Sequence, residues 1–206
     1  MSPSCPSASQ PALFRQADQW LSRARASLLD ALPCRKGCSR CCIGPFPITI
    51  LDREEIHRGL DRLPAHERHD IEQRAREQII AMQIRYPRLK HSCLLDEWDD
   101  GVIDQLVTDF AELPCPALQS DGSCGIYESR PVTCRTMGIP FEEKGLVQGA
   151  CEIQTFVPIR QISLSIREQE RQLTHQEGVA LDQLRQQHKV EGEEILLAFG
   201  FVDMKA

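Results

Sequence analysis

The chain has 206 residues, enough for one domain with its own buried core, so it does not depend on disulfide staples as a very small domain would. Its net charge of −6 and low aromatic content (5%) argue against nonspecific binding to nucleic acids or anionic membranes. No apolar run approaches the ~18 residues that cross a membrane, and the first residues lack the basic and apolar regions of a secretory signal.

The N-terminal part divides into a tail and a helix. Residues 1–11 are rich in serine and proline and are predicted to be a disordered tail, in which Cys5 is a bystander. Apolar residues then recur with helical spacing over residues 12–32, until Pro33 ends the pattern. We therefore expect the first cysteine of the cluster, Cys34, to follow the C-terminal end of a helix.

Helical periodicity dominates most of the remaining chain. Asp52 and Glu55, three residues apart, resemble a capping box and predict a helix that starts there. Further helices are expected over residues 65–86, 102–113, 128–137 and 159–184. A small β-hairpin is expected around the turn Ser120-Asp121-Gly122, and Ile195 to Val202 forms a last apolar segment. The fold class is therefore mainly α, with one small β element.

We divide the chain into a disordered tail (1–11), a cysteine-cluster metal-binding domain (12–157) and a C-terminal helical extension (158–206) packed on the same domain. The charged face of that C-terminal helix is the surface offered to a protein partner, while a nucleic acid or membrane partner is not expected.

Eight of the ten cysteines fall in a dense run and in a later, more open series. They are Cys34, Cys38, Cys41, Cys42, Cys115, Cys124, Cys134 and Cys151. In the reducing cytoplasm of a bacterial-type cell, which is the expected location, metal binding explains such a set better than disulfides do. Ligand sets made only of thiolates favour zinc, iron–sulfur clusters or cuprous copper. None of the six histidines lies inside a cysteine-rich segment, and the pair His91 and Cys93 has no supporting spacing.

The spacing of the first cysteine run distinguishes a zinc site from an iron–sulfur cluster. Structural zinc usually takes two Cys-x2-Cys knuckles, and this chain has one, Cys38-x2-Cys41. Cys34-x3-Cys38-x2-Cys41 can instead hold three irons of a [4Fe–4S] cluster, with a fourth ligand from further along the chain. Radical SAM enzymes share this spacing, but Arg40 stands where they carry an aromatic residue, and the helical chain lacks their alternating strands and helices. An iron–sulfur cluster is preferred over Zn2+.

Taken together, the cysteine motifs resemble those of the YkgJ-like cysteine-cluster family, described as a zinc- or iron-chelating domain. The matching motifs are Cys34-x3-Cys38-x2-Cys41-Cys42, Cys115-Pro116-Ala117-Leu118, Cys124-Gly125-Ile126-Tyr127-Glu128-Ser129-Arg130-Pro131-Val132-Thr133-Cys134-Arg135 and the trailing Cys151. The resemblance covers residues 34 to about 151 and implies a metal site at the eight cysteines. Many members continue after Cys134-Arg135 with an aromatic residue and a proline, whereas Thr136 to Pro140 intervene here.

Three functions remain open at this point. The first is a metal-binding protein acting in metal handling, electron transfer or redox sensing. The second is an enzyme that modifies a protein side chain, because one group related to the family methylates flagellin lysines. The third is an interaction module that zinc stabilises. Ile126-Tyr127 is expected to pack the hairpin on the helices, and Arg130-Pro131 to start the next helix.

Overall fold

The computed structural model describes residues 12–28, 32, 38–143, 145–149, 151, 161–188 and 192–203. The predicted N-terminal tail, with Cys5, and the first cysteine of the cluster, Cys34, lie outside the described residues.

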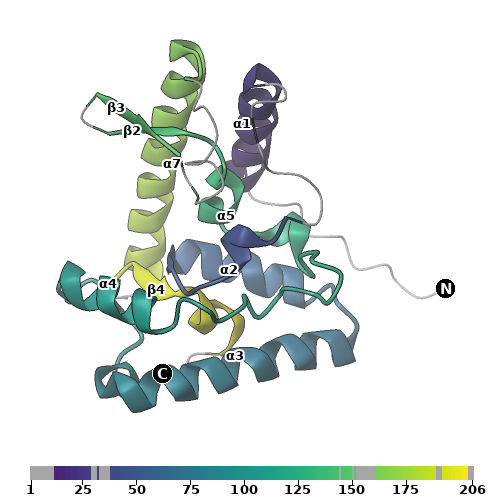
Figure 1. Cartoon of the computed structure of the whole chain (residues 1–206), viewed down its shortest axis with the longest axis vertical. Helices are drawn as coiled ribbons and strands as arrows, with labels where there is room; N and C mark the ends of the chain where they lie inside the picture. Colours follow the sequence, from purple (N-terminus) through teal and green to yellow (C-terminus); the bar gives the residue numbers. More distant parts are fainter. Residues whose placement is uncertain are drawn as a thin grey trace.

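Helices dominate the described residues (Figure 1), which confirms the predicted mainly α class. The α-helices are α1 (Ala12–Leu28), α2 (Ile50–Leu60), α3 (Ala65–Arg85), α4 (Asp100–Asp109), α5 (Val132–Thr136) and α7 (Leu164–His188). The 3-10 helices are η2 (Arg40–Cys42), η3 (Pro87–Lys90), η4 (Tyr127–Ser129) and η5 (Leu197–Phe201). Strand β1 (Pro47–Thr49) pairs antiparallel with β4 (Glu194–Leu196), and β2 (Phe141–Glu143) pairs antiparallel with β3 (Leu146–Gln148). Among the described residues, no helix combines the length and the apolar character that a bilayer span requires.

The main core lies where α2 and α3 pack on the C-terminal 3-10 helix η5. Ile56, Leu60 and Met82 are fully buried there, and Phe201 fills the space between the two helices. Gly200 is required in η5 because a Cβ atom at this position would lie 2.8 Å from the Cδ1 atoms of both Ile48 and Ile56. The C-terminal segment therefore shares one core with α2 and α3.

A second layer is formed by α1 and α7, which stand side by side and rise away from α2 and α3 (Figure 1). Trp20 is buried between them, and its indole N–H donates to the carbonyl of Ile166 at 3.0 Å. The short helix α5 contacts α1 near the foot of this layer, with Val132 packed against Phe14 and Leu173. The layer thus brings a helix from outside the cysteine-rich segment against the helix that carries Cys134.

The start of α2 differs from the expected capping box at Asp52. Thr49 is the N-cap, because its hydroxyl accepts from the amide of Asp52 at 3.1 Å while the Asp52 carboxylate accepts from the amide of Thr49. The box is therefore real, but Asp52 is its third residue rather than its first. A threonine and an aspartate can each cap a helix, and strand pairing of Thr49 with Glu194 fixes the choice.

The expected hairpin is reduced to a turn. The amide of Gln119 donates to Ser123 at 2.8 Å and Gly122 has φ of 80°, but the pairing around this turn is limited to one bridge, between Leu118 and Cys124. The hairpin β2–β3 lies instead between residues 141 and 148, and the expected helix over 128–137 is divided into η4 and α5 by Pro131.

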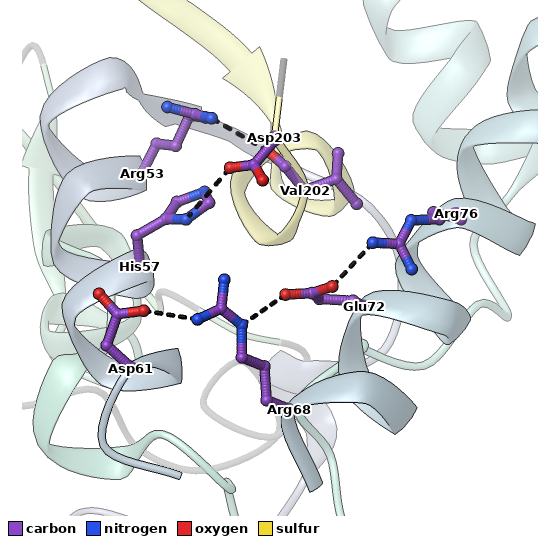
Figure 2. A network of polar contacts seen from close by, with 8 residues as sticks. All are labelled: Arg53, His57, Asp61, Arg68, Glu72, Arg76, Val202 and Asp203. Atoms are coloured by element: carbon purple, nitrogen blue, oxygen red, sulfur yellow. Dashed lines mark hydrogen bonds and ion pairs between the residues drawn. The ribbon is translucent and has the colours of Figure 1, made fainter. Parts of the chain in front are cut away.

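The C-terminal segment is held on α2 by polar contacts (Figure 2). Arg53 donates to the carbonyl of Val202 at 3.1 Å, and the Nδ1 atom of His57 lies 3.9 Å from the Asp203 carboxylate. The Nε2 atom of His57 is buried with no hydrogen-bond partner among the described residues. Burial, and then the positive charge of Arg53, lower the pKa of His57.

This environment predicts a loss of stability in acid. Because the pKa of His57 is lower in the folded chain than in the unfolded one, the unfolded chain takes up its proton first as the pH falls. The free energy of unfolding should decrease from about pH 6.5 downward and level off once the folded form is also protonated. Urea unfolding of the native chain and of His57→Gln between pH 8 and 5 measures this as a difference between the two proteins. An identical pH dependence in both would refute the assignment.

Candidate metal centre

The structure brings cysteines from three separate segments together. Cys41 and Cys42 form the end of η2, Cys115 and Cys124 lie on either side of the turn at Gly122, and Cys134 lies in α5. Their charges act on one another: Cys41, Cys115 and Cys134 each perturb Cys42, and Cys124 perturbs both Cys115 and Cys134. These five residues, which we call the thiol cluster, lie near enough for their charges to influence one another, although 93 positions separate Cys41 from Cys134.

A backbone contact joins the first two segments. The amide of Cys115 donates to the carbonyl of Cys42 at 2.6 Å, and the amide of Gly44 donates to Leu113 at 2.7 Å. Ile43 and Pro114 form an isolated bridge between these two hydrogen bonds. This short ladder joins Cys42 and Cys115 through backbone hydrogen bonds rather than through sulfur atoms.

Gly44 makes the ladder possible. Its φ of 90° lies in the left-handed region, and a Cβ atom here would lie 3.3 Å from the carbonyl oxygen of Ala111. Gly44→Ala is therefore expected to destabilise the folded chain by about 1–2 kcal/mol, measured by urea unfolding. Gly178→Ala is the control, because its Cβ would meet open space on α7. Equal stability of the two variants would contradict a strained turn.

The second segment is fastened to α3. Arg74 donates to the carbonyl of Pro116 at 2.8 Å, and Gln78 donates to Pro114 at 2.7 Å, so two side chains of one helix hold the carbonyls on both sides of Cys115. The amide of Gly125 donates to Ala117 at 2.8 Å, which carries Cys124 back toward Cys115.

The third segment is fixed by two buried charged side chains. A carboxylate oxygen of Asp52 accepts from the amide of Val132 at 2.7 Å, at the N-terminal end of α5. Arg135 has no exposed surface and donates to the carbonyls of Arg130 and Glu128 at 3.0 and 2.9 Å. Its remaining nitrogen forms an ion pair with Asp18 of α1. The residue next to Cys134 therefore connects α1, η4 and α5.

Burial and the hydrogen bond between Cys41 and Cys42 dominate the electrostatics of the thiol cluster. A hydrogen bond between the two side chains lowers the pKa of Cys41 to about 6 and raises that of Cys42. Burial raises the pKa of Cys115 to about 12 and that of Cys134 well above its usual value, and the neighbouring thiols add to both shifts. Several thiolates can be held together here only if a cation compensates their charge.

Arg130 is a cation beside these thiols, and Arg25 also acts on Cys41. Its charge lowers the pKa of Cys41 and opposes the rise at Cys124, and its side chain is 12% exposed. The guanidinium lies 3.7 Å from the ring centre of Tyr127, which is 49% exposed. The expectation that Ile126 and Tyr127 pack the turn on the helices holds for Ile126, which is buried, and is wrong for Tyr127, whose ring lies against Arg130. Pro131 precedes α5 as expected.

The other three predicted ligands are not part of the thiol cluster. Cys38 and Cys151 are partly buried free thiols, and Cys34 is outside the described residues. Across the described ranges, no three cysteine, histidine or carboxylate side chains form a group compact enough to hold one metal ion. Cys93 packs against the main core, where burial raises its pKa.

The chemistry of the donors fits a thiophilic metal. The donors of the cluster are sulfur atoms, they are partly buried, and the charge of Arg130 acts on Cys41 and Cys124. Zinc and iron–sulfur clusters accept such donors, whereas magnesium and calcium require oxygen.

Comparisons with known proteins agree with this chemistry. One family model, CxxCxxCC, described as "Putative zinc- or iron-chelating domain", matches residues 33–152, which is more than half of the chain. No curated protein and no solved structure gave a significant match.

Proposed function

The chain belongs to the CxxCxxCC family of zinc- or iron-chelating domains and has a metal-binding role, and from this premise we propose that the metal is held by a split, all-cysteine site. The proposed ligands are Cys34, Cys38, Cys41, Cys42, Cys115, Cys124, Cys134 and Cys151.

One observation supports the proposal: thiols from three distant segments lie within electrostatic range of one another, in a region that contacts outside the thiols hold together. The ladder between Cys42 and Cys115 and the anchoring of α5 by Asp52 are both made without sulfur atoms. Because neighbouring thiols raise the pKa of Cys42 and Cys134, ionising all of the thiols together is unfavourable. A bound cation removes this obstacle, because metal ligation requires the thiolate form.

We propose an iron–sulfur cluster, [4Fe–4S] in the first instance, ahead of zinc. A single zinc ion takes four ligands, usually from two Cys-x2-Cys knuckles. Here eight of the ten cysteines are proposed as ligands, and Cys38-x2-Cys41 is the one knuckle of this spacing in the sequence. Such a cluster would supply a one-electron redox couple. Electron transfer, redox sensing or metal handling in the cytoplasm would each use a site of this kind.

Anaerobic purification followed by metal and sulfide analysis tests the proposal. We expect a brown protein that absorbs near ~400 nm and contains iron together with acid-labile sulfide. Colourless protein with stoichiometric zinc under the same conditions would replace the cluster by a zinc site. Protein without any bound metal would overturn the split site itself.

A further inference from the structure

A cavity of about 340 Å³ lies between α5, β2 and α7, on the side of α5 that faces α7. Its apolar walls come from all three elements, and threonine hydroxyls and two carboxylates interrupt them. The lining residues are Val132, Thr133, Thr136, Met137, Ile139, Phe141, Glu170, Leu173, Thr174 and Glu177. The volume is in the range of sites that take small molecules, about 300–1,000 Å³.

Glu177 is the unusual residue of this cavity. It is partly buried, and it has no hydrogen bond and no cationic partner among the described residues. The neighbouring carboxylates of α7 differ in this respect: Glu170 is paired with Arg167 and Glu168 with Arg171. Burial, and then the negative charge of Asp52, raise the pKa of Glu177 to about 7.

This position of Glu177 reduces the stability of the fold. A carboxyl group with a raised pKa keeps its proton longer in the folded chain than in the unfolded one, so stability falls as the pH rises from about 4.5 through 7. The described fold offers no compensating contact. An unpaired carboxylate at the wall of a cavity is a typical feature of a binding residue, because function is where proteins tolerate such losses.

We propose that this cavity binds a small organic ammonium compound, with its N–H groups donating to the Glu177 carboxylate and its carbon chain lying against Val132, Ile139 and Leu173. The hydroxyls of Thr133 and Thr136 are further acceptors at the wall. Among the described residues, neither a lysine nor an arginine lines this cavity, which favours a cationic ligand over an anionic one. Glu170 is already paired, so a divalent cation would find too few free oxygen ligands.

The inference does not depend on which metal the cysteines bind, because Glu177 and the apolar wall lie outside the proposed ligand set. Thr133 does adjoin Cys134, so the occupied cavity would lie directly behind the helix that carries a proposed metal ligand.

Calorimetric titration of the purified, metal-containing chain with n-butylammonium at pH 8 tests the site. We expect saturable binding, at least about tenfold weaker in Glu177→Gln, because the charge-assisted hydrogen bonds are lost. The same substitution should raise the melting temperature at pH 8, since it removes an unpaired carboxylate. Asp182→Asn is the matched control: it also removes one negative charge from α7, its side chain is 70% exposed, and it does not line the cavity.

Three results would overturn the proposal. They are absence of binding to the native chain, equal affinity of the native chain and Glu177→Gln, and binding of neutral n-butanol as tightly as n-butylammonium. A lower melting temperature of Glu177→Gln would contradict the claim that the carboxylate is unpaired in the fold. Iron, sulfide and zinc contents measured on the same samples keep this outcome separate from that of the metal proposal.

Discussion

Replacing Arg135 by alanine is expected to destabilise the folded chain by about 3–5 kcal/mol, among the largest effects of any single substitution. The side chain is fully buried, donates to two carbonyls and forms an ion pair, so its removal leaves the carbonyls of Glu128 and Arg130 without their donor and Asp18 without its nearer arginine. Urea unfolding measures the loss. Because Arg135 holds the helix of Cys134, the metal content of this variant should fall as well.

Two further variants make this prediction specific. Arg135→Lys should recover little stability, because one ammonium group cannot reach two carbonyls and Asp18 at once. Arg171→Ala removes an exposed arginine paired with Glu168 and should change stability by less than about 0.5 kcal/mol. A small effect of Arg135→Ala would mean that α5 does not depend on this buried charge.

Removing the metal is expected to destabilise the cysteine-rich segment by about 5 kcal/mol or more, because a structural thiolate site contributes ~10–16 kcal/mol of binding free energy in zinc-finger peptides. The loss should be local. Hydrogen exchange after chelation is expected to accelerate at the amides of Gly44 and Cys115, which join the two cysteine segments. The amides of Ile50 and Leu95, which bond to Glu193 and Glu194 beside the main core, should remain protected.

The main core explains this difference. Its residues come from α2, α3 and η5, and it buries large apolar side chains such as Leu60 and Phe201. Unchanged exchange at Gly44 and Cys115 would mean that the backbone ladder alone stabilises the segment. Equal acceleration at all four amides would mean that the core itself needs the metal.

The sequence predicts the helices well because their signal is local. Apolar residues at helical spacing indicate α1, α3 and α7, and the observed bounds differ mainly at the ends. The β pairing is not predictable in the same way, since β1 and β4 are joined across about 146 residues and neither is long enough to show alternation. The sequence pattern places the N-cap of α2 at Asp52, three residues too late, because Thr49 and Asp52 both have side chains that can cap a helix.

The ligand pool is predictable from cysteine spacing, but the supports of the site are not. Arg135 belongs to a recognisable motif, yet its partner Asp18 lies in α1, far outside that motif, and the pattern alone does not pair them. Asp52 carries a local role as a helix cap and a distant one as the acceptor for Val132. Such double roles depend on packing between elements, and only the folded chain reveals them.

Metal analysis of Cys124→Ser beside Cys93→Ser tests the central claim most directly. Both cysteines are partly buried, and burial raises the pKa of both, but only Cys124 belongs to the thiol cluster. We expect the Cys93 variant, purified without oxygen, to keep the metal content of the native chain and the Cys124 variant to lose at least about half of it. Full metal content in Cys124→Ser, or an equal loss in both variants, would contradict a metal site shared between the distant cysteine segments.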